Sequence, residues 1–282
     1  WQAFVWLLKI LVPISFLTFL LAYSGWLHKI DFLLAPLMNL LSLPAAAAFP
    51  RLVGLLSGIY GGIAAMATLP FTTQQMTLMA IFMLISQYLF QESIIQGRSG
   101  LNGWTATLVR LGASIFTVLI TAPFLNMASE TLASGLSAGA PDQSLFAALQ
   151  VWCGQIFLLG CKIFLIIMPL MVLLELMKTY HLIRYLSVIM NPLMRLMGLS
   201  RQAGFLWLTA AVFGLAYGCA IIVEEVKLGQ LEDADLKKLH LSIGINHSLI
   251  EDPVLFLPLG IGPFWLWVPR LITAIIFVWV YT

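Results

Sequence analysis

Gln87-Tyr88-Leu89-Phe90-Gln91-Glu92 is the stretch that decides how this chain is organised, because Asn246-His247-Ser248-Leu249-Ile250-Glu251 repeats its pattern 159 residues later. Each stretch begins with an amide side chain and ends in an acid within an apolar segment. Other matching segments lie at offsets of 156 to 160: Pro36–Leu40 with Pro192–Leu196, Gly58 and Gly62 with Gly214 and Gly218, and Arg110-Leu111 with Arg270-Leu271. Small insertions explain the drift, so the sequence contains two copies of one unit.

The composition places both copies in a membrane. Of 282 residues, 61% are hydrophobic and only 9% are charged, and the mean hydropathy is +0.99. A water-soluble domain needs a more highly charged surface than this, so we predict an all-α polytopic membrane protein. The net charge of +2 without a basic run argues against a nucleic-acid partner. The chain begins at Trp1, which leaves open whether an N-terminal segment precedes it.

Each copy shows the same order of five elements. A long apolar helix comes first, followed by a segment of mixed polarity that is expected to lie in the membrane interface. A glycine-punctuated apolar stretch, a helix carrying the acid and a helix carrying one arginine complete the unit. The expected elements of the first copy are Phe4–Trp26, His28–Leu43, Pro44–Leu69, Thr72–Gly97 and Gly103–Phe124. Those of the second are Phe146–Leu176, Thr179–Leu199, Gly204–Val223, Asp235–Leu259 and Pro263–Tyr281. The repeats are 1–126 and 146–282, with a Ser-, Ala- and Gly-rich linker at 127–145.

The distribution of lysine and arginine indicates whether the glycine-punctuated stretch crosses the membrane. If it crosses, the basic residues divide 3 against 6 between the two sides; if it is a re-entrant hairpin, they divide 8 against 1 or 2. Because basic residues concentrate in cytoplasmic loops, the hairpin is favoured. Each copy then crosses three times, so the second copy is inverted and both termini are cytoplasmic. Simple helix packing is the alternative reading of the glycines, and the two readings are compatible.

Glu92 and Glu251 are the strongest candidates for an ion or substrate site. An acid within a membrane helix costs roughly 2.5–3.5 kcal/mol on insertion scales, so a compensating role is expected. Pro253 follows the second acid closely and predicts a helix break there, which would expose backbone carbonyls. The structural alternative is an ion pair with a basic residue such as Arg110 or Arg270, and we expect these two arginines to pair with acids or with broken-helix carbonyls.

Four further side chains are candidates of lower rank. Gln87 and Asn246 can both donate and accept hydrogen bonds, as recognition of a nucleobase or sugar requires, although bonding between helices is equally plausible. His247 lies one helical turn before Glu251 and could relay protons, the alternative being a satisfied buried histidine. Cys219 is a weak candidate for a soft metal. The cysteine count of three is odd and predicts no disulfide framework.

These motifs resemble the nucleoside-recognition, or Gate, domain family. The resemblance rests on Gln87 through Glu92 with Gly97 and Gly103, and on His247 through Pro253 with Gly260. The family is similar to spore maturation membrane proteins, to the membrane part of ferrous-iron transporters and to concentrative nucleoside transporters. The resemblance implies two inverted repeats, each with three transmembrane helices, one interfacial helix and one re-entrant hairpin. It implies a solute site at Gly58, Gly62, Gln87, Glu92, and at Gly214, Gly218, Asn246, Glu251 in the other copy.

The function expected from these features is transport of a small polar solute or ion, with a nucleoside-like solute or a cation at the membrane midplane. Sodium or a proton is the expected coupling ion, and the bacterial cytoplasmic membrane is the expected location. The alternative is a non-transporting assembly or regulatory partner that keeps the fold, in a homo-oligomer or with another membrane protein. An enzyme is not expected, because no nucleophile–base pair or metal motif occurs at catalytic spacing.

Overall fold

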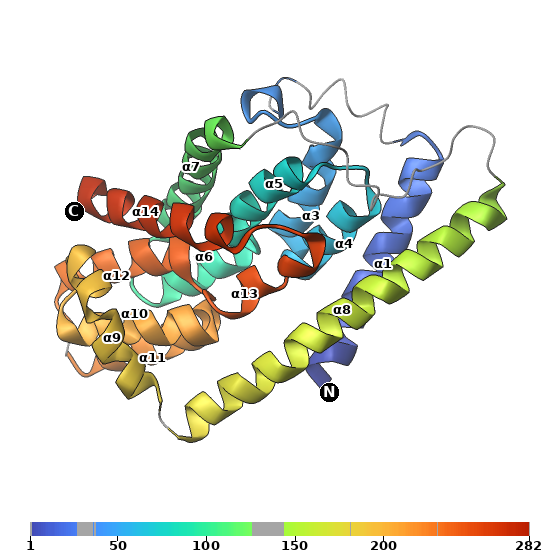
Figure 1. Cartoon of the computed structure of the whole chain (residues 1–282). Helices are drawn as coiled ribbons and strands as arrows, with labels where there is room; N and C mark the ends of the chain where they lie inside the picture. The colour runs from blue at the N-terminus through green and yellow to red at the C-terminus, as the bar shows by residue number, and fades with distance from the viewer. Residues whose placement is uncertain are drawn as a thin grey trace.

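The computed structural model describes residues 2–26, 36, 38–125, 144–180, 182–229 and 231–281, and it is all-α (Figure 1). The described helices of the first half are α1 (Gln2–Tyr23), α3 (Ala48–Ser57), α4 (Ile59–Thr68), α5 (Thr73–Ser86), α6 (Leu89–Arg98) and α7 (Gly103–Thr121), with short 3₁₀ turns at Ala45–Ala47 and Ala122–Phe124. Those of the second half are α8 (Leu145–Thr179), α9 (Ile183–Leu196), α10 (Arg201–Phe213), α11 (Leu215–Lys227), α12 (Asp233–Asn246), α13 (Glu251–Val254) and α14 (Pro263–Tyr281), with a 3₁₀ turn at Leu257–Leu259.

The first helix of each half, α1 and α8, lie side by side at one edge of the molecule, and the remaining helices form the main body (Figure 1). The indole N–H of Trp152 donates to Ser15 Oγ at 2.9 Å and joins the two helices. Ser15 also bonds Thr68 of α4 at 2.9 Å, which ties the α1–α8 pair to the body. With 35 residues, α8 extends about 52 Å and exceeds the roughly 30 Å hydrocarbon core of a bilayer.

Each half contains two short helices joined by one glycine. Gly58 separates α3 from α4 with φ 84° and ψ −175°, and Gly214 separates α10 from α11 with φ 89° and ψ 164°. Only glycine adopts this backbone region readily, so these residues fix both elbows. The arms of the first elbow have 10 residues each, about 15 Å, which is half the thickness of the hydrocarbon core. We call the segments around Gly58 and Gly214 the hairpin elbows.

The helix that follows each pair of short helices is interrupted. A capping box between Thr72 and Gln75 starts α5, which stops at Ser86; Gln87 is extended and Tyr88 is left-handed, with φ 43°, before α6 begins. In the second half α12 stops at Asn246, and Ser248 is left-handed with φ 47°. The predicted helix Thr72–Gly97 is therefore interrupted in its middle, and the predicted helix Asp235–Leu259 is interrupted before the position expected from Pro253. We call Gln87–Tyr88 and His247–Ser248 the helix breaks.

The predicted break at Pro253 is also misplaced. The chain leaves the helix six residues earlier, at His247, and Pro253 lies inside the short helix α13. Proline fits there because the first turn of a helix leaves its N–H groups unbonded anyway.

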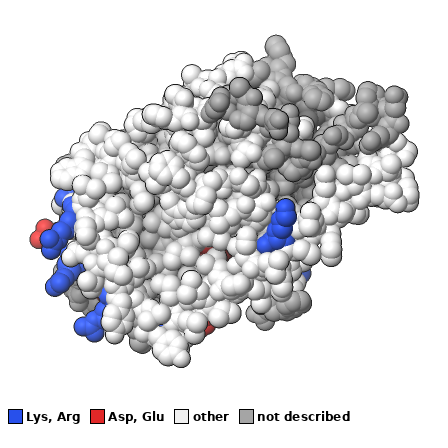
Figure 2. Space-filling model, in the orientation of Figure 1, with Lys and Arg blue, Asp and Glu red and all other residues white. Residues whose placement is uncertain are grey.

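Five described segments are long and apolar enough to cross a membrane: Phe4–Tyr23, Thr73–Arg98, Gly103–Phe124, Leu145–Thr179 and Pro263–Tyr281. The amphipathic helix α9 falls within the predicted segment Thr179–Leu199 and exposes Tyr185, Val188 and Ile189. Most of the predicted segment His28–Leu43 and nearly all of the linker lie outside the described residues. Much of the face seen in Figure 2 carries no charge, and lysine and arginine gather mainly at the end formed by α9 to α12.

We predict that Gly58→Ala destabilises the protein more than Gly214→Ala. Both substitutions incur the backbone strain of the glycine-only region, about 1–3 kcal/mol. At Gly58 a Cβ would also lie 2.0 Å from the ring of Tyr88, whereas at Gly214 the nearest atom is Ser248 Oγ at 3.1 Å. Thermal unfolding of the purified protein in detergent measures the difference.

The matched control for both elbows is Gly112→Ala. Gly112 lies inside α7 with no atom within 4 Å of its added Cβ, so the melting temperature should stay the same or rise. Equal melting temperatures for Gly58→Ala and the wild type would contradict the prediction.

Candidate functional site

Two buried arginines hold the two helix breaks, and they do so in the same way. Arg110 on α7 donates from Nε to Ile85 O at 3.0 Å and from NH2 to Gln87 O at 2.8 Å. Arg270 on α14 donates to Ile245 O at 3.1 Å and to His247 O at 3.0 Å. Neither side chain is exposed. Both guanidinium groups thus donate hydrogen bonds to backbone carbonyls at the helix breaks. This is one of the two kinds of partner that the sequence suggested for these arginines.

The equivalent bonds show how the two copies align at the breaks. Arg110, Ile85 and Gln87 correspond to Arg270, Ile245 and His247, each at an offset of 160 residues. Gln87 is therefore equivalent to His247 and not to Asn246, and at the same offset Glu92 corresponds to Asp252 instead of Glu251. The left-handed residues Tyr88 and Ser248 obey the same offset.

The hairpin elbows pack directly on the helix breaks. Tyr88 N donates to Gly54 O at 3.3 Å, and Ser248 N donates to Ala210 O, also at 3.3 Å. In the first half the side chain of Gln87 adds a further bond, because its Oε1 accepts from the backbone N–H of Ile59 at 3.2 Å. Each elbow and break therefore form one unit held by backbone atoms.

Polar side chains connect the two halves where these units meet. Gln87 Nε2 donates to Asp252 Oδ2 and lies 3.4 Å from His247 Nε2. Glu92 Oε2 lies 3.3 Å from the same His247 nitrogen. The hydroxyl of Tyr60, in α4, donates to Glu251 Oε1 at 2.8 Å. We call Tyr60, Gln87, Glu92, His247, Glu251 and Asp252, with the two arginines, the polar centre.

The polar centre is almost withdrawn from solvent. The side chain of Glu92 is 13% exposed, and Asp252, Gln87 and His247 are buried. Glu92 forms a 2.5 Å ion pair with NH2 of Arg110, which compensates the cost of burying its charge. The ion pair that the sequence offered as a structural alternative is therefore present, and the same carboxylate also faces the second half.

Gln87, Glu92, His247 and Glu251 all lie in the polar centre, whereas Asn246 and Cys219 form none of the hydrogen bonds described for it. Asn246 is buried, and neither amide atom has a hydrogen-bond partner among the described residues. Cys219 is buried in α11, and no group of three His, Cys, Asp or Glu side chains is placed to hold a metal within the described part of the chain. Gly62 and Gly218 serve close packing, since an added Cβ would meet Met83 and Ala210 respectively.

The sequence did not single out Asp252 and Tyr60. Asp252 directly follows Glu251, and the sequence pattern pointed to Glu251 alone as the counterpart of Glu92. An alignment at offset 160, anchored on the two arginines, would have found it. Tyr60 lies in an otherwise apolar stretch, and no sequence pattern marks it as a site residue. Its hydroxyl belongs to the site only because it contacts Glu251 in the other half.

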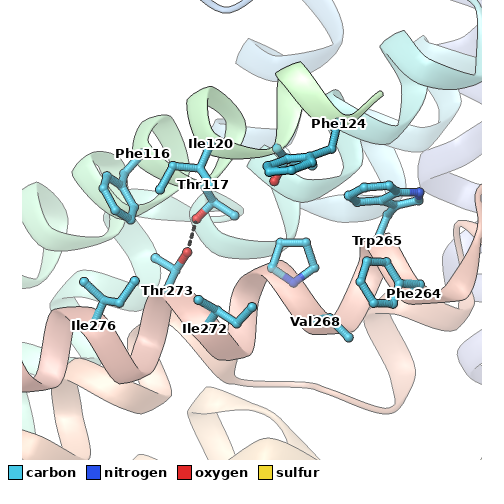
Figure 3. A pocket seen from close by; sticks show the side chains of 12 residues that line it. Phe116, Thr117, Ile120, Phe124, Phe264, Trp265, Val268, Ile272, Thr273 and Ile276 are labelled. Atoms are coloured by element: carbon cyan, nitrogen blue, oxygen red, sulfur yellow. Dashed lines mark hydrogen bonds between the residues drawn. The ribbon is translucent and has the colours of Figure 1, made fainter. Parts of the chain in front are cut away.

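A separate groove of about 220 Å³ lies between α7 and α14 and is apolar (Figure 3). Aromatic and aliphatic side chains line most of it, including Phe116, Phe124 and Trp265. The hydroxyls of Thr117 and Thr273 bond each other at 2.8 Å, as the dashed line in Figure 3 shows. This groove lacks the charged groups that would hold a polar solute, so the polar centre remains the candidate site.

Elbows, broken helices and buried charges on an all-α scaffold with five membrane-length helices define an integral membrane protein with a polar centre. The sequence profile described as nucleoside recognition (Gate) matches residues 4–141 and 161–247. The chain therefore belongs to the Gate family. It is also 25% identical, over 271 residues, to the uncharacterized membrane protein YvoD of Bacillus subtilis (strain 168), covering 95% of this chain and 86% of the relative. No structure solved by experiment matches it significantly.

We predict strong energetic coupling between Arg110 and Glu92. Arg110→Gln alone leaves a buried carboxylate without its partner, which costs about 3–5 kcal/mol in buried pairs. Adding Glu92→Gln removes that charge, so the double variant should be more stable than the sum of the single effects implies. A double-mutant cycle on unfolding free energy in mixed micelles measures this coupling, expected at about 1–3 kcal/mol.

The control cycle uses Lys227 and Glu224, an exposed pair at 2.9 Å within α11. Its coupling should be at most about 0.5 kcal/mol. Equal coupling in both cycles would show that the buried pair has no special energetic role.

Proposed function

We propose that this protein is a secondary transporter that binds a small polar solute or ion at the polar centre. The observation that carries this proposal is the meeting of two helix breaks, two hairpin elbows and three carboxyl groups in one largely buried place. Charged groups inside a membrane protein commonly mark substrate and ion pathways. Interrupted helices near the midplane commonly supply the binding groups of transporters.

The repeated architecture supports a specific arrangement for transport. We infer that the two halves are inverted repeats, that the α3–α4 and α10–α11 pairs are re-entrant hairpins, and that both termini are cytoplasmic. Rocking of one half against the other would then open the polar centre to alternate sides. The bonds from Gln87 to Asp252 and from Tyr60 to Glu251 join the halves and would have to break during this motion.

The chemistry of the polar centre suits a solute with donors and acceptors, or a cation. Gln87 offers a two-sided amide, and Glu92, Glu251 and Asp252 offer carboxylates. A nucleoside-like solute is the substrate class that the family description favours. The bacterial cytoplasmic membrane is the proposed location, since the YvoD relative is a membrane protein of a bacterium.

We predict that Glu92→Gln and Glu251→Gln each reduce uptake at least tenfold while the protein remains folded. Glu92→Gln removes the charge that faces both Arg110 and His247, and Glu251→Gln removes the charged acceptor of Tyr60. Uptake of radiolabelled nucleosides and of sodium into proteoliposomes provides the measurement, with size-exclusion profiles and melting curves to verify folding.

Glu224→Gln is the matched control, because Glu224 is an exposed acid outside the polar centre. Its uptake should equal that of the wild type. If the folded wild type transports none of the solutes tested and none of them raises its melting temperature, the transport function is rejected. The alternative of a non-transporting membrane partner is then favoured.

A further inference from the structure

The position of His247 is fixed through one of its ring nitrogens. Nδ1 lies 3.2 Å from the carbonyl oxygen of Ile243, one turn earlier in α12. A carbonyl only accepts, so Nδ1 carries a proton and donates it. The other nitrogen, Nε2, points into the polar centre, where its state is not fixed by any backbone group.

Nε2 of His247 lies between a hydrogen-bond donor, the amide of Gln87, and a hydrogen-bond acceptor, the carboxylate of Glu92. The Gln87 amide is oriented by its own bonds: Oε1 accepts from Ile59 N and Nε2 donates to Asp252. It therefore presents only N–H to His247, at 3.4 Å. Glu92 Oε2, at 3.3 Å on another side, already accepts a hydrogen bond from Arg110 and, as a carboxylate, offers His247 only an acceptor.

These contacts give His247 two alternative hydrogen bonds. Without a proton, Nε2 accepts from Gln87 and faces Glu92 with no hydrogen between them. With a proton, Nε2 donates to Glu92 and faces the amide of Gln87 with two donors opposed. One added proton thus exchanges one partner for the other without requiring the ring to move.

We propose that Nε2 of His247 is a reversible proton-binding site that switches the polar centre between a Gln87-bonded and a Glu92-bonded state. Its role as the coupling site for transport rests on the proposed function. Gln87 also bonds the first hairpin elbow, at Ile59, so the switch acts on the contact between that elbow and the second half.

The charges around His247 accommodate one proton. Glu92 on α6 and Glu251 and Asp252 on α13 carry up to three negative charges, while Arg110 on α7 and Arg270 on α14 carry two positive charges. Three further titratable groups lie close to the polar centre, namely Tyr60 on α4, Tyr88 at the first break and Cys219 on α11, and all are neutral near pH 7 at their ordinary pKa values. One proton taken up by the centre would balance these charges. A metal cation at Glu92 Oε2 would be repelled by Arg110, which is already bound there at 2.5 Å.

The test is a histidine titration by NMR on the full chain, labelled with ¹³C-histidine, in nanodiscs between pH 5 and 9. The resonance lost in His247→Gln identifies this residue among the four histidines. If that variant does not fold, replacing His28, His181 and His240 by Gln leaves His247 as the only histidine. We expect His247 to titrate within this range, and Glu92→Gln to move its midpoint at least one pH unit lower, because the imidazolium loses its acceptor.

His240→Gln is the control, since His240 Nε2 faces the carbonyl of Ser99 at 2.9 Å and no carboxylate. It should leave the titration of His247 unchanged. A His247 resonance that keeps one protonation state from pH 5 to 9 would overturn the proton site even if transport is found. Titration of His247 in a protein that moves no solute would retain the proton site and reject the transport function.

Discussion

The structure depends on the hydrogen bonds that two buried arginines donate to backbone carbonyls at the two helix breaks. A chain that leaves its helix inside a membrane has no water to satisfy the freed backbone groups, so the break survives only where protein atoms replace water. Arg110 and Arg270 each bond two such carbonyls. The breaks in turn position Gln87 and His247, and Tyr88 and Ser248 bond the hairpin elbows, so the geometry of the polar centre follows from these two side chains.

The halves are joined by side chains rather than by backbone pairing at the polar centre. Each connecting contact has one partner in each half: Gln87 with Asp252, Glu92 with His247, and Tyr60 with Glu251. Side-chain bonds can be exchanged for bonds to a solute, whereas the backbone bonds within each elbow-and-break unit can remain. This division between permanent and exchangeable bonds suits a protein whose two rigid parts move against each other.

Hydropathy predicted the all-α membrane class and the approximate bounds of the long helices. Repetition also identified Arg110, Arg270 and Glu92, because a charge that recurs in an apolar segment is visible without any structure. The position of the breaks was not predictable in this way. Gln87-Tyr88 and His247-Ser248 contain neither glycine nor proline, while Pro253 falsely marked a later position, so the break is imposed by arginines more than 20 residues away in the chain. Contacts between the halves, such as Tyr60 with Glu251, leave no local pattern either.

Gln87 and His247 occupy equivalent places in two otherwise similar units, and in the transport cycle proposed above their difference would affect the relative free energy of the two conformations. If both positions held the same residue, exchanging the roles of the halves would give two conformations of nearly equal free energy. An amide cannot change its charge near neutral pH, but an imidazole can. Protonation of His247, as proposed above, would therefore let the pH shift the balance between two conformations that perfect internal symmetry would leave equally populated.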